Sequence, residues 1–60
     1  MCDKVLLLDM EYKLKKAIMR LNGLLDKALS QADMIATSQL EAALVLKNIE
    51  LRELEELEED

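Results

Sequence analysis

Apolar residues recur every three or four positions along the first half of the chain. At about 100° per residue, this spacing places them on one narrow stripe of an α-helix, a periodicity that no β-strand shares. We therefore predict a first helix over about residues 3–29, with Asp3 as its N-cap. The stripe consists of Leu7, Met10, Leu14, Ile18, Leu21, Leu25, Ala28 and Ala32.

The second half predicts a second helix, from the low thirties to about residue 56, followed by a frayed acidic tail over 57–60. A helix with two apolar faces is covered by more than one neighbour, so this half predicts an assembly of more than two helices. One face carries Leu40, Ala43, Leu44, Leu51 and Leu54. A further stripe consists of Ile35, Ala42, Leu46, Ile49 and Leu57.

The chain is expected to reverse within residues 30–37, where two N-cap signals compete. Ser30 is followed three residues later by Asp33, which resembles an N-cap pattern. Ser38 and Glu41 form a Ser-x-x-Glu capping box. The two signals place the turn differently, and both remain open at this stage.

One continuous helix is the alternative to a hairpin. Gly23 lies inside the unbroken stripe and is interpreted as a tolerated interior glycine, which costs only about 1 kcal/mol. A straight helix through the middle of the chain would be a rod of about 80 Å. The residues that would continue the stripe at four-residue spacing are Ala28, Ala32, Ala36 and Leu40.

The predicted fold is a single all-α domain over residues 1–60: an antiparallel, coiled-coil-like helical hairpin that dimerises into a four-helix bundle. A core of this size rarely supplies more than about 3–5 kcal/mol. Cys2 is the single cysteine and there is no histidine, which excludes an intrachain disulfide and a Cys/His zinc site. Oligomerisation is the remaining source of stability. The predicted oligomer core is Leu7, Leu14, Ile18, Leu21, Leu25, Leu40, Leu44 and Leu51.

Charge and composition narrow the choice of partners. The net charge is −5, which argues against binding to nucleic acid. The apolar run at residues 5–8 is too short for a signal-peptide core or a membrane span. With the free thiol of Cys2, this predicts a cytoplasmic protein that has neither a nucleic-acid nor a membrane partner.

The residues suggest no catalytic, cofactor or metal site. A nucleophile–base pair and a glycine-rich phosphate loop are both missing from the sequence. We therefore expect a non-enzymatic regulatory or adaptor protein that binds itself, as a dimer, and a protein partner through helical surfaces. A structural module whose only partner is itself is the alternative.

One segment suggests an enzymatic alternative. The sequence Met-Ile-Ala-Thr-Ser-Gln-Leu-Glu at 34–41, followed by Leu44 and Val45, resembles the Ser-Gln-Glu-Leu-Asp motif of small bacterial sporulation-control phosphatases. The resemblance covers roughly residues 10–46. Ser38 and Gln39 match directly, whereas Leu and Asp of the motif match 40–41 only after a one-residue deletion. Without that gap, alanine takes the place of the aspartate, and the glycine-containing loop of the family is missing.

The resemblance implies a helical hairpin that hydrolyses the aspartyl-phosphate of a response-regulator receiver domain. Its candidate catalytic residues here are Ser38, Gln39 and Glu41. The amide of Gln39 would position the attacking water and the carboxylate of Glu41 would orient it. The receiver domain would supply the metal and the phosphate, so this chain would need no cofactor of its own.

Overall fold

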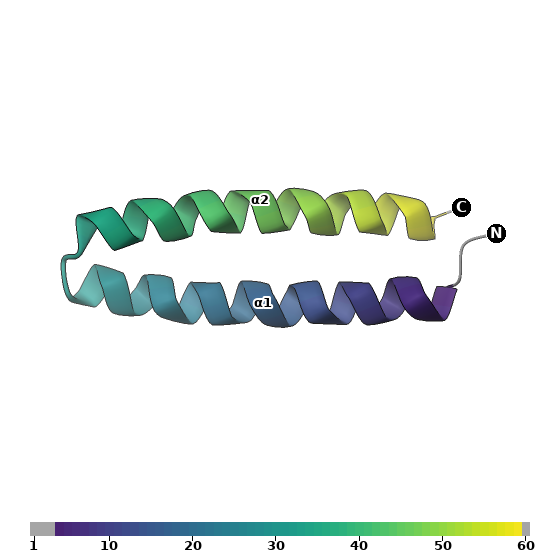
Figure 1. Cartoon of the computed structure of the whole chain (residues 1–60), viewed down its shortest axis with the longest axis horizontal. Coiled ribbons are helices and arrows are strands. Elements are labelled where there is room, and N and C mark those ends of the chain that lie inside the picture. The colour runs from purple at the N-terminus through teal and green to yellow at the C-terminus, as the bar shows by residue number, and fades with distance from the viewer. Residues whose placement is uncertain (1–3, 60) are drawn as a thin grey trace.

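The computed structural model describes residues 4–59 and consists of two antiparallel α-helices joined by a tight turn (Figure 1). Helix α1 comprises Lys4–Ser30 and helix α2 comprises Met34–Glu58. The hairpin is 47 Å long and only 14 by 11 Å across. The predicted helical hairpin is confirmed, and the continuous helix is wrong because the chain reverses over residues 31–33. The predicted N-cap Asp3 lies outside the described residues.

The two helices meet along a seam that follows a strict seven-residue repeat. Residues of this seam alternate at spacings of three and four, which is the 3.5-residue period of a coiled coil. All of them are buried or half-buried. The seam consists of Leu7, Glu11, Leu14, Ile18, Leu21, Leu25 and Ala28 of α1, and Thr37, Leu40, Leu44, Lys47, Leu51, Leu54 and Glu58 of α2.

All eight residues of the predicted oligomer core lie in this seam, Leu44 buried and the other seven half-buried. Two residues of the predicted α1 stripe do not. Met10 is exposed beside the seam, where Glu11 takes the inward position, and Ala32 lies in the turn. The predicted stripe followed apolar residues and so took Met10 in place of the neighbouring Glu11, and it ran on past the end of α1 to Ala32.

The turn is built from a Schellman motif with alanine at its left-handed position. Ala32 has φ 54°, and its N–H donates to the carbonyl of Leu29 at 3.1 Å. The N–H of Asp33 donates to the carbonyl of Ala28 at 2.9 Å. This pair of bonds satisfies carbonyls at the end of α1, a geometry in which glycine is the usual residue.

Asp33 also begins α2. Its Oδ1 accepts a hydrogen bond from the N–H of Ala36 at 3.1 Å, and its carbonyl accepts one from Thr37 Oγ1 at 2.8 Å. Both predicted N-caps, Ser30 and Ser38, are therefore wrong, because Asp33 caps α2. Ser30 ends α1, with its hydroxyl donating to the carbonyl of Lys27, and Ser38 lies within α2 rather than at its N-terminus.

Helix α2 continues two residues beyond its predicted end at 56, so part of the expected frayed tail is helical. Leu57 packs beside Met10 and Leu14, and Glu58 lies in the seam. The apolar contact of Leu57 favours this extension, against the unfavourable placement of carboxylates at a helix C-terminus. Leu57 was predicted on the same stripe as Ile35 and Ile49, but the seven-residue repeat places it at the flank of the seam.

The glycine of this chain stands at a position that does not need one. Gly23 continues α1 without a positive φ, and a Cβ added there would meet nothing within 4 Å. Glycine in a helix interior costs roughly 0.5–1 kcal/mol relative to alanine. A non-glycine residue in the left-handed region costs about 1–2 kcal/mol, and Ala32 occupies that region.

Exchanging the two residue types should therefore stabilise the hairpin. The double variant Gly23→Ala/Ala32→Gly has the same composition as the natural chain, and we expect its free energy of unfolding to rise by about 2 kcal/mol. The two sites are far enough apart for their effects to add. Urea unfolding followed by circular dichroism at fixed protein concentration measures the change, and an unchanged or lower midpoint would contradict the turn geometry.

Candidate functional site

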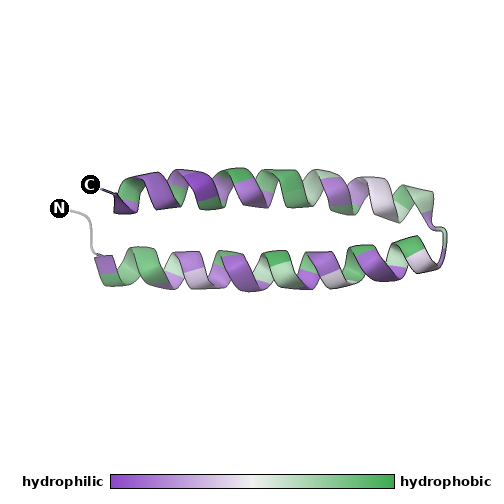
Figure 2. Cartoon of the chain, turned by 180° about the vertical axis from the view of Figure 1, so that it is seen from behind, coloured by the Kyte–Doolittle hydropathy of each residue, from purple (hydrophilic) through white to green (hydrophobic). Residues whose placement is uncertain are grey.

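The hairpin leaves most of its large apolar side chains in contact with solvent. Among the described residues, only Ala28, Leu44 and Leu54 form a buried apolar core, whereas fourteen large apolar side chains are at least 45% exposed. Apolar segments lie along the outward sides of both helices as well as between them (Figure 2). The surface of this hairpin is therefore its candidate functional site.

One flank of the seam forms an apolar groove, which we call the groove flank. It contains two hollows of about 330 and 260 Å³, one near the turn and one near the open end. Leu24, Ala36 and Leu40 line the first, and Met10, Leu54 and Leu57 line the second. In the seven-residue repeat the groove flank is formed by Met10, Ala17 and Leu24 of α1, and Ala36, Ala43, Glu50 and Leu57 of α2.

The opposite flank is more polar, and we call it the polar flank. Asn48 Nδ2 donates to the carbonyl of Leu44 at 2.8 Å, and Lys15 Nζ lies 2.7 Å from Glu11 Oε1. Apolar side chains occur on this flank only toward its ends. It is formed by Leu8, Lys15, Asn22 and Leu29 of α1, and Met34, Glu41, Asn48 and Glu55 of α2.

Each helix also carries an outer apolar stripe that faces away from its partner helix. Lys16 Nζ lies 5.3 Å from the centre of the Tyr12 ring, so a cation covers part of the stripe on α1. The outer stripes consist of Val5, Tyr12 and Met19 on α1, and Ile35, Ala42, Leu46 and Ile49 on α2, all of them exposed.

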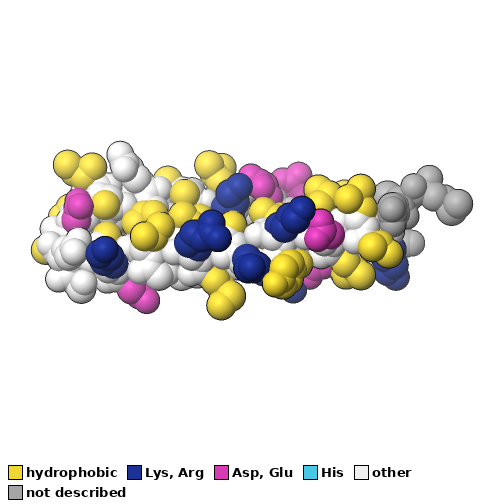
Figure 3. Space-filling view, turned by 60° about the horizontal axis from the view of Figure 1, so that its bottom comes forward, with side chains coloured by type: hydrophobic (Ala, Val, Ile, Leu, Met, Phe, Trp, Pro, Cys, Tyr) yellow, Lys and Arg dark blue, Asp and Glu magenta, His cyan; other side chains and the backbone are white. Residues whose placement is uncertain are grey.

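The two helices carry opposite net charge. Helix α1 has six Lys and Arg residues against three Asp and Glu residues, a net charge of +3. Helix α2 has two basic residues against six acidic ones, a net charge of −4. Figure 3 shows basic side chains spread along one face of the hairpin, with apolar side chains between them.

A carboxyl pair interrupts the seam at the open end. The hydrogen bond from Lys15 lowers the pKa of Glu11, and Glu11 in turn raises the pKa of Glu58 by hydrogen bonding to its protonated form. The hydrogen bond with Glu11 also raises the pKa of Lys15. Glu58 Oε1 is buried without a hydrogen-bond partner. The pair is therefore best satisfied when Glu58 is protonated and Glu11 is ionised.

The carboxyl pair predicts how stability depends on pH. Glu58 has a raised pKa, so its contribution is complete below the ordinary glutamate value of about 4.3 and is lost as pH rises through the raised value. Glu11 has a lowered pKa, so its contribution is present above about 4.3 and is lost as pH falls through the lowered value. We expect Glu58→Gln, which mimics the protonated side chain, to raise the Tm at pH 7.

The gain should shrink toward pH 4, where Glu58 of the natural chain takes up its proton. Glu56→Gln is the matched control, because it removes the same charge from an exposed position on the same turn of α2. Thermal unfolding at fixed protein concentration measures both variants. If Glu56→Gln gave an equal gain, the cause would be the helix dipole rather than the carboxyl pair.

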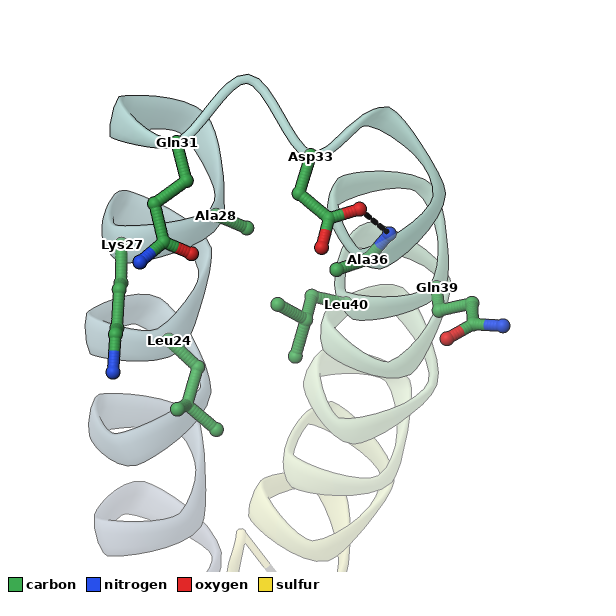
Figure 4. Close-up of a pocket in the computed structure, with 8 residues that line it drawn as sticks. All are labelled: Leu24, Lys27, Ala28, Gln31, Asp33, Ala36, Gln39 and Leu40. Carbon is green, nitrogen blue, oxygen red and sulfur yellow. Dashed lines mark hydrogen bonds between the residues drawn. The ribbon is translucent and has the colours of Figure 1, made fainter.

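The structure separates the candidate catalytic residues suggested by the phosphatase resemblance. Ser38, Gln39 and Glu41 are all exposed. Gln39 borders the hollow near the turn, and its side chain points away from α1 (Figure 4). Glu41 lies on the polar flank. The amide and the carboxylate therefore face different sides of α2 and form no common site.

Sequence reasoning missed the polar members of the seam. Thr37 is only 6% exposed, and its hydroxyl is satisfied by the carbonyl of Asp33. Lys47 is half-buried and reaches Glu50 at 3.7 Å. The signal was present, because Thr37, Leu44, Leu51 and Glu58 are spaced by seven. A search for apolar residues alone passes over such positions.

Compared with known proteins, the chain matches no family model, no curated protein and no solved structure. Over residues 4–59, the acidic side chains do not gather into a group of three that could hold a metal ion. Neither of the two described helices has the length and apolar character needed to cross a membrane.

Proposed function

We propose that this chain is a small regulatory or adaptor protein that acts by helix-mediated self-association and by binding a protein partner. The exposed apolar surface carries the proposal. The chain exposes 4866 Å² of polar and apolar surface together, whereas a compact monomer of this mass exposes about 4000 Å². The excess follows from the elongated shape of the hairpin, which leaves fourteen large apolar side chains at least 45% exposed.

The position of this surface supports a partner in addition to a second copy. Apolar side chains occupy the groove flank and both outer stripes, so they lie on three sides of the hairpin. A second hairpin that packs along one side leaves at least one outer stripe exposed. A protein that only assembled with itself would gain nothing from that remaining stripe.

The proposal predicts a dimer whose folding depends on association. Sedimentation equilibrium at micromolar concentration should give twice the 6.9 kDa chain mass. Leu44→Ala should destabilise the assembly by about 2–5 kcal/mol, because Leu44 is buried in the seam. Val45→Ala, at the exposed neighbouring position, should cost much less. A stable, folded monomer would contradict self-association.

The adaptor role is separated from pure assembly by variants of the outer stripes. Met19→Gln and Ile49→Gln should leave the dimer intact, because the two residues lie on the outer sides of the hairpin. In cells, cross-links from the dimer to a specific second protein should disappear in these variants. Retained cross-links, or a dimer that cross-links only to itself, would overturn the adaptor role.

The second candidate function is the phosphatase activity implied by the resemblance to sporulation-control phosphatases. One observation favours it: Ser38 and Gln39 are exposed on an uninterrupted helix, and Gln39 borders an open hollow. We expect any such activity to depend on Gln39 and not on Glu41, since the two face different sides of α2. The test incubates phosphorylated receiver domains with the chain and follows phosphate loss, using Gln39→Ala and Glu41→Ala. Equal loss with and without the chain would contradict this function.

A further inference from the structure

We propose that the groove flank binds a second copy of this chain, with α1 of each hairpin packed on α2 of the other and both turns at the same end of the bundle. This inference rests on the proposed self-association and adds the surface and the orientation. It makes the dimer a four-helix bundle whose two-fold axis runs along its length.

The groove flank is the side best suited to close packing between hairpins. Glu50 is the one ionisable residue at its seven repeat positions, with Lys27, Asp33 and Glu53 at the edges of its two hollows. The polar flank holds Lys15, Glu41 and Glu55 as well as two asparagines at its own repeat positions. Ala17 and Ala43 lie near the middle of the groove flank and let a partner helix approach closely. The larger side chains of Met10 and Leu24 stand at the two hollows.

Charge decides between the two possible orientations of such a dimer. If the turns lay at opposite ends, each helix would pack on its own copy, placing +3 beside +3 and −4 beside −4. If the turns lie at the same end, each α1 packs on an α2 and opposite charges meet. Both arrangements keep every neighbouring pair of helices antiparallel, so charge is the property that distinguishes them.

The residues that border the groove flank also differ in charge between the two helices. The border on α1 is basic, with Lys13, Arg20 and Lys27 at seven-residue spacing. The border on α2 carries Glu53, next to Glu50 of the groove flank. With both turns at one end, the open-end part of α1 that holds Lys13 lies level with Glu53 of the second copy. These exposed charges are screened over about 8 Å at physiological salt, so they select the orientation while apolar burial supplies most of the affinity.

A distance between two turns tests the orientation. Cys2→Ser removes the native thiol, and Gln31→Cys places one spin label at the turn of each full-length chain. Double electron–electron resonance spectroscopy of the labelled dimer should give a distance between the two spin labels below about 25 Å, the width of two helices. A distance near the 47 Å length of the hairpin would overturn the proposal.

A matched pair of variants tests the surface. Leu24 and Leu29 lie on the same helix with exposed fractions of 46% and 56%, but on the groove flank and the polar flank respectively. Leu24→Gln should weaken dimerisation at least tenfold in sedimentation equilibrium, and Leu29→Gln should change it less than threefold. The reverse order, or equal effects, would overturn the assignment of the groove flank.

The outcomes separate this inference from the proposed function. A dimer with distant turns retains self-association and rejects the orientation, whereas a dimer insensitive to Leu24→Gln retains self-association and rejects the surface. A folded monomer would reject the self-association, the orientation and the surface together. Circular dichroism of each variant at the same concentration shows whether its helices still form, so that a loss of folding is not taken for a loss of contact.

Discussion

The fold depends on a single seam between two helices. The hairpin is elongated and only one helix diameter deep, so each helix can bury one face against the other and no more. Leu44 and Leu54 are the large apolar side chains that fall in the buried class among the described residues, and both keep a small exposed fraction. Burial of apolar area is the dominant favourable term in folding, and one seam supplies little of it. The apolar side chains on the outer surface are exposed because the seam has room for so few of them.

The sequence was sufficient to predict the seam but not its polar members. The seven leucines and one isoleucine of the predicted oligomer core all lie in the seam within the hairpin, because helical periodicity fixes which side chains share a face. The apolar pattern placed Met10 inward and overlooked Glu11, because a search for apolar residues takes the methionine and passes over the neighbouring glutamate. Which of the two faces the seam depends on the partner helix, which periodicity alone does not describe.

The turn shows a different limit of sequence reasoning. Residues 30–37 were correctly expected to contain the reversal, but the cap signals at Ser30 and Ser38 disagreed about its position and neither residue caps α2. Asp33 prevails because it serves both helices at once, through its N–H at the end of α1 and its Oδ1 at the start of α2. Ala32 adopts the left-handed conformation because the two Schellman hydrogen bonds offset its steric cost.

The candidate site was less predictable than the turn, since the exposure of an apolar stripe depends on which neighbouring helices are present.

Both ends of the hairpin carry a local weakness that lowers the stability of the isolated chain. Alanine is strained at the turn, and two carboxyl groups meet at the open end. The middle of the molecule holds apolar seam layers and the alanines of the groove flank. A partner that binds there stabilises the folded chain by mass action, because it binds the hairpin and not the unfolded chain. Association at the groove flank would therefore determine how much of the chain is folded, and with it how much outer stripe is available to a partner protein.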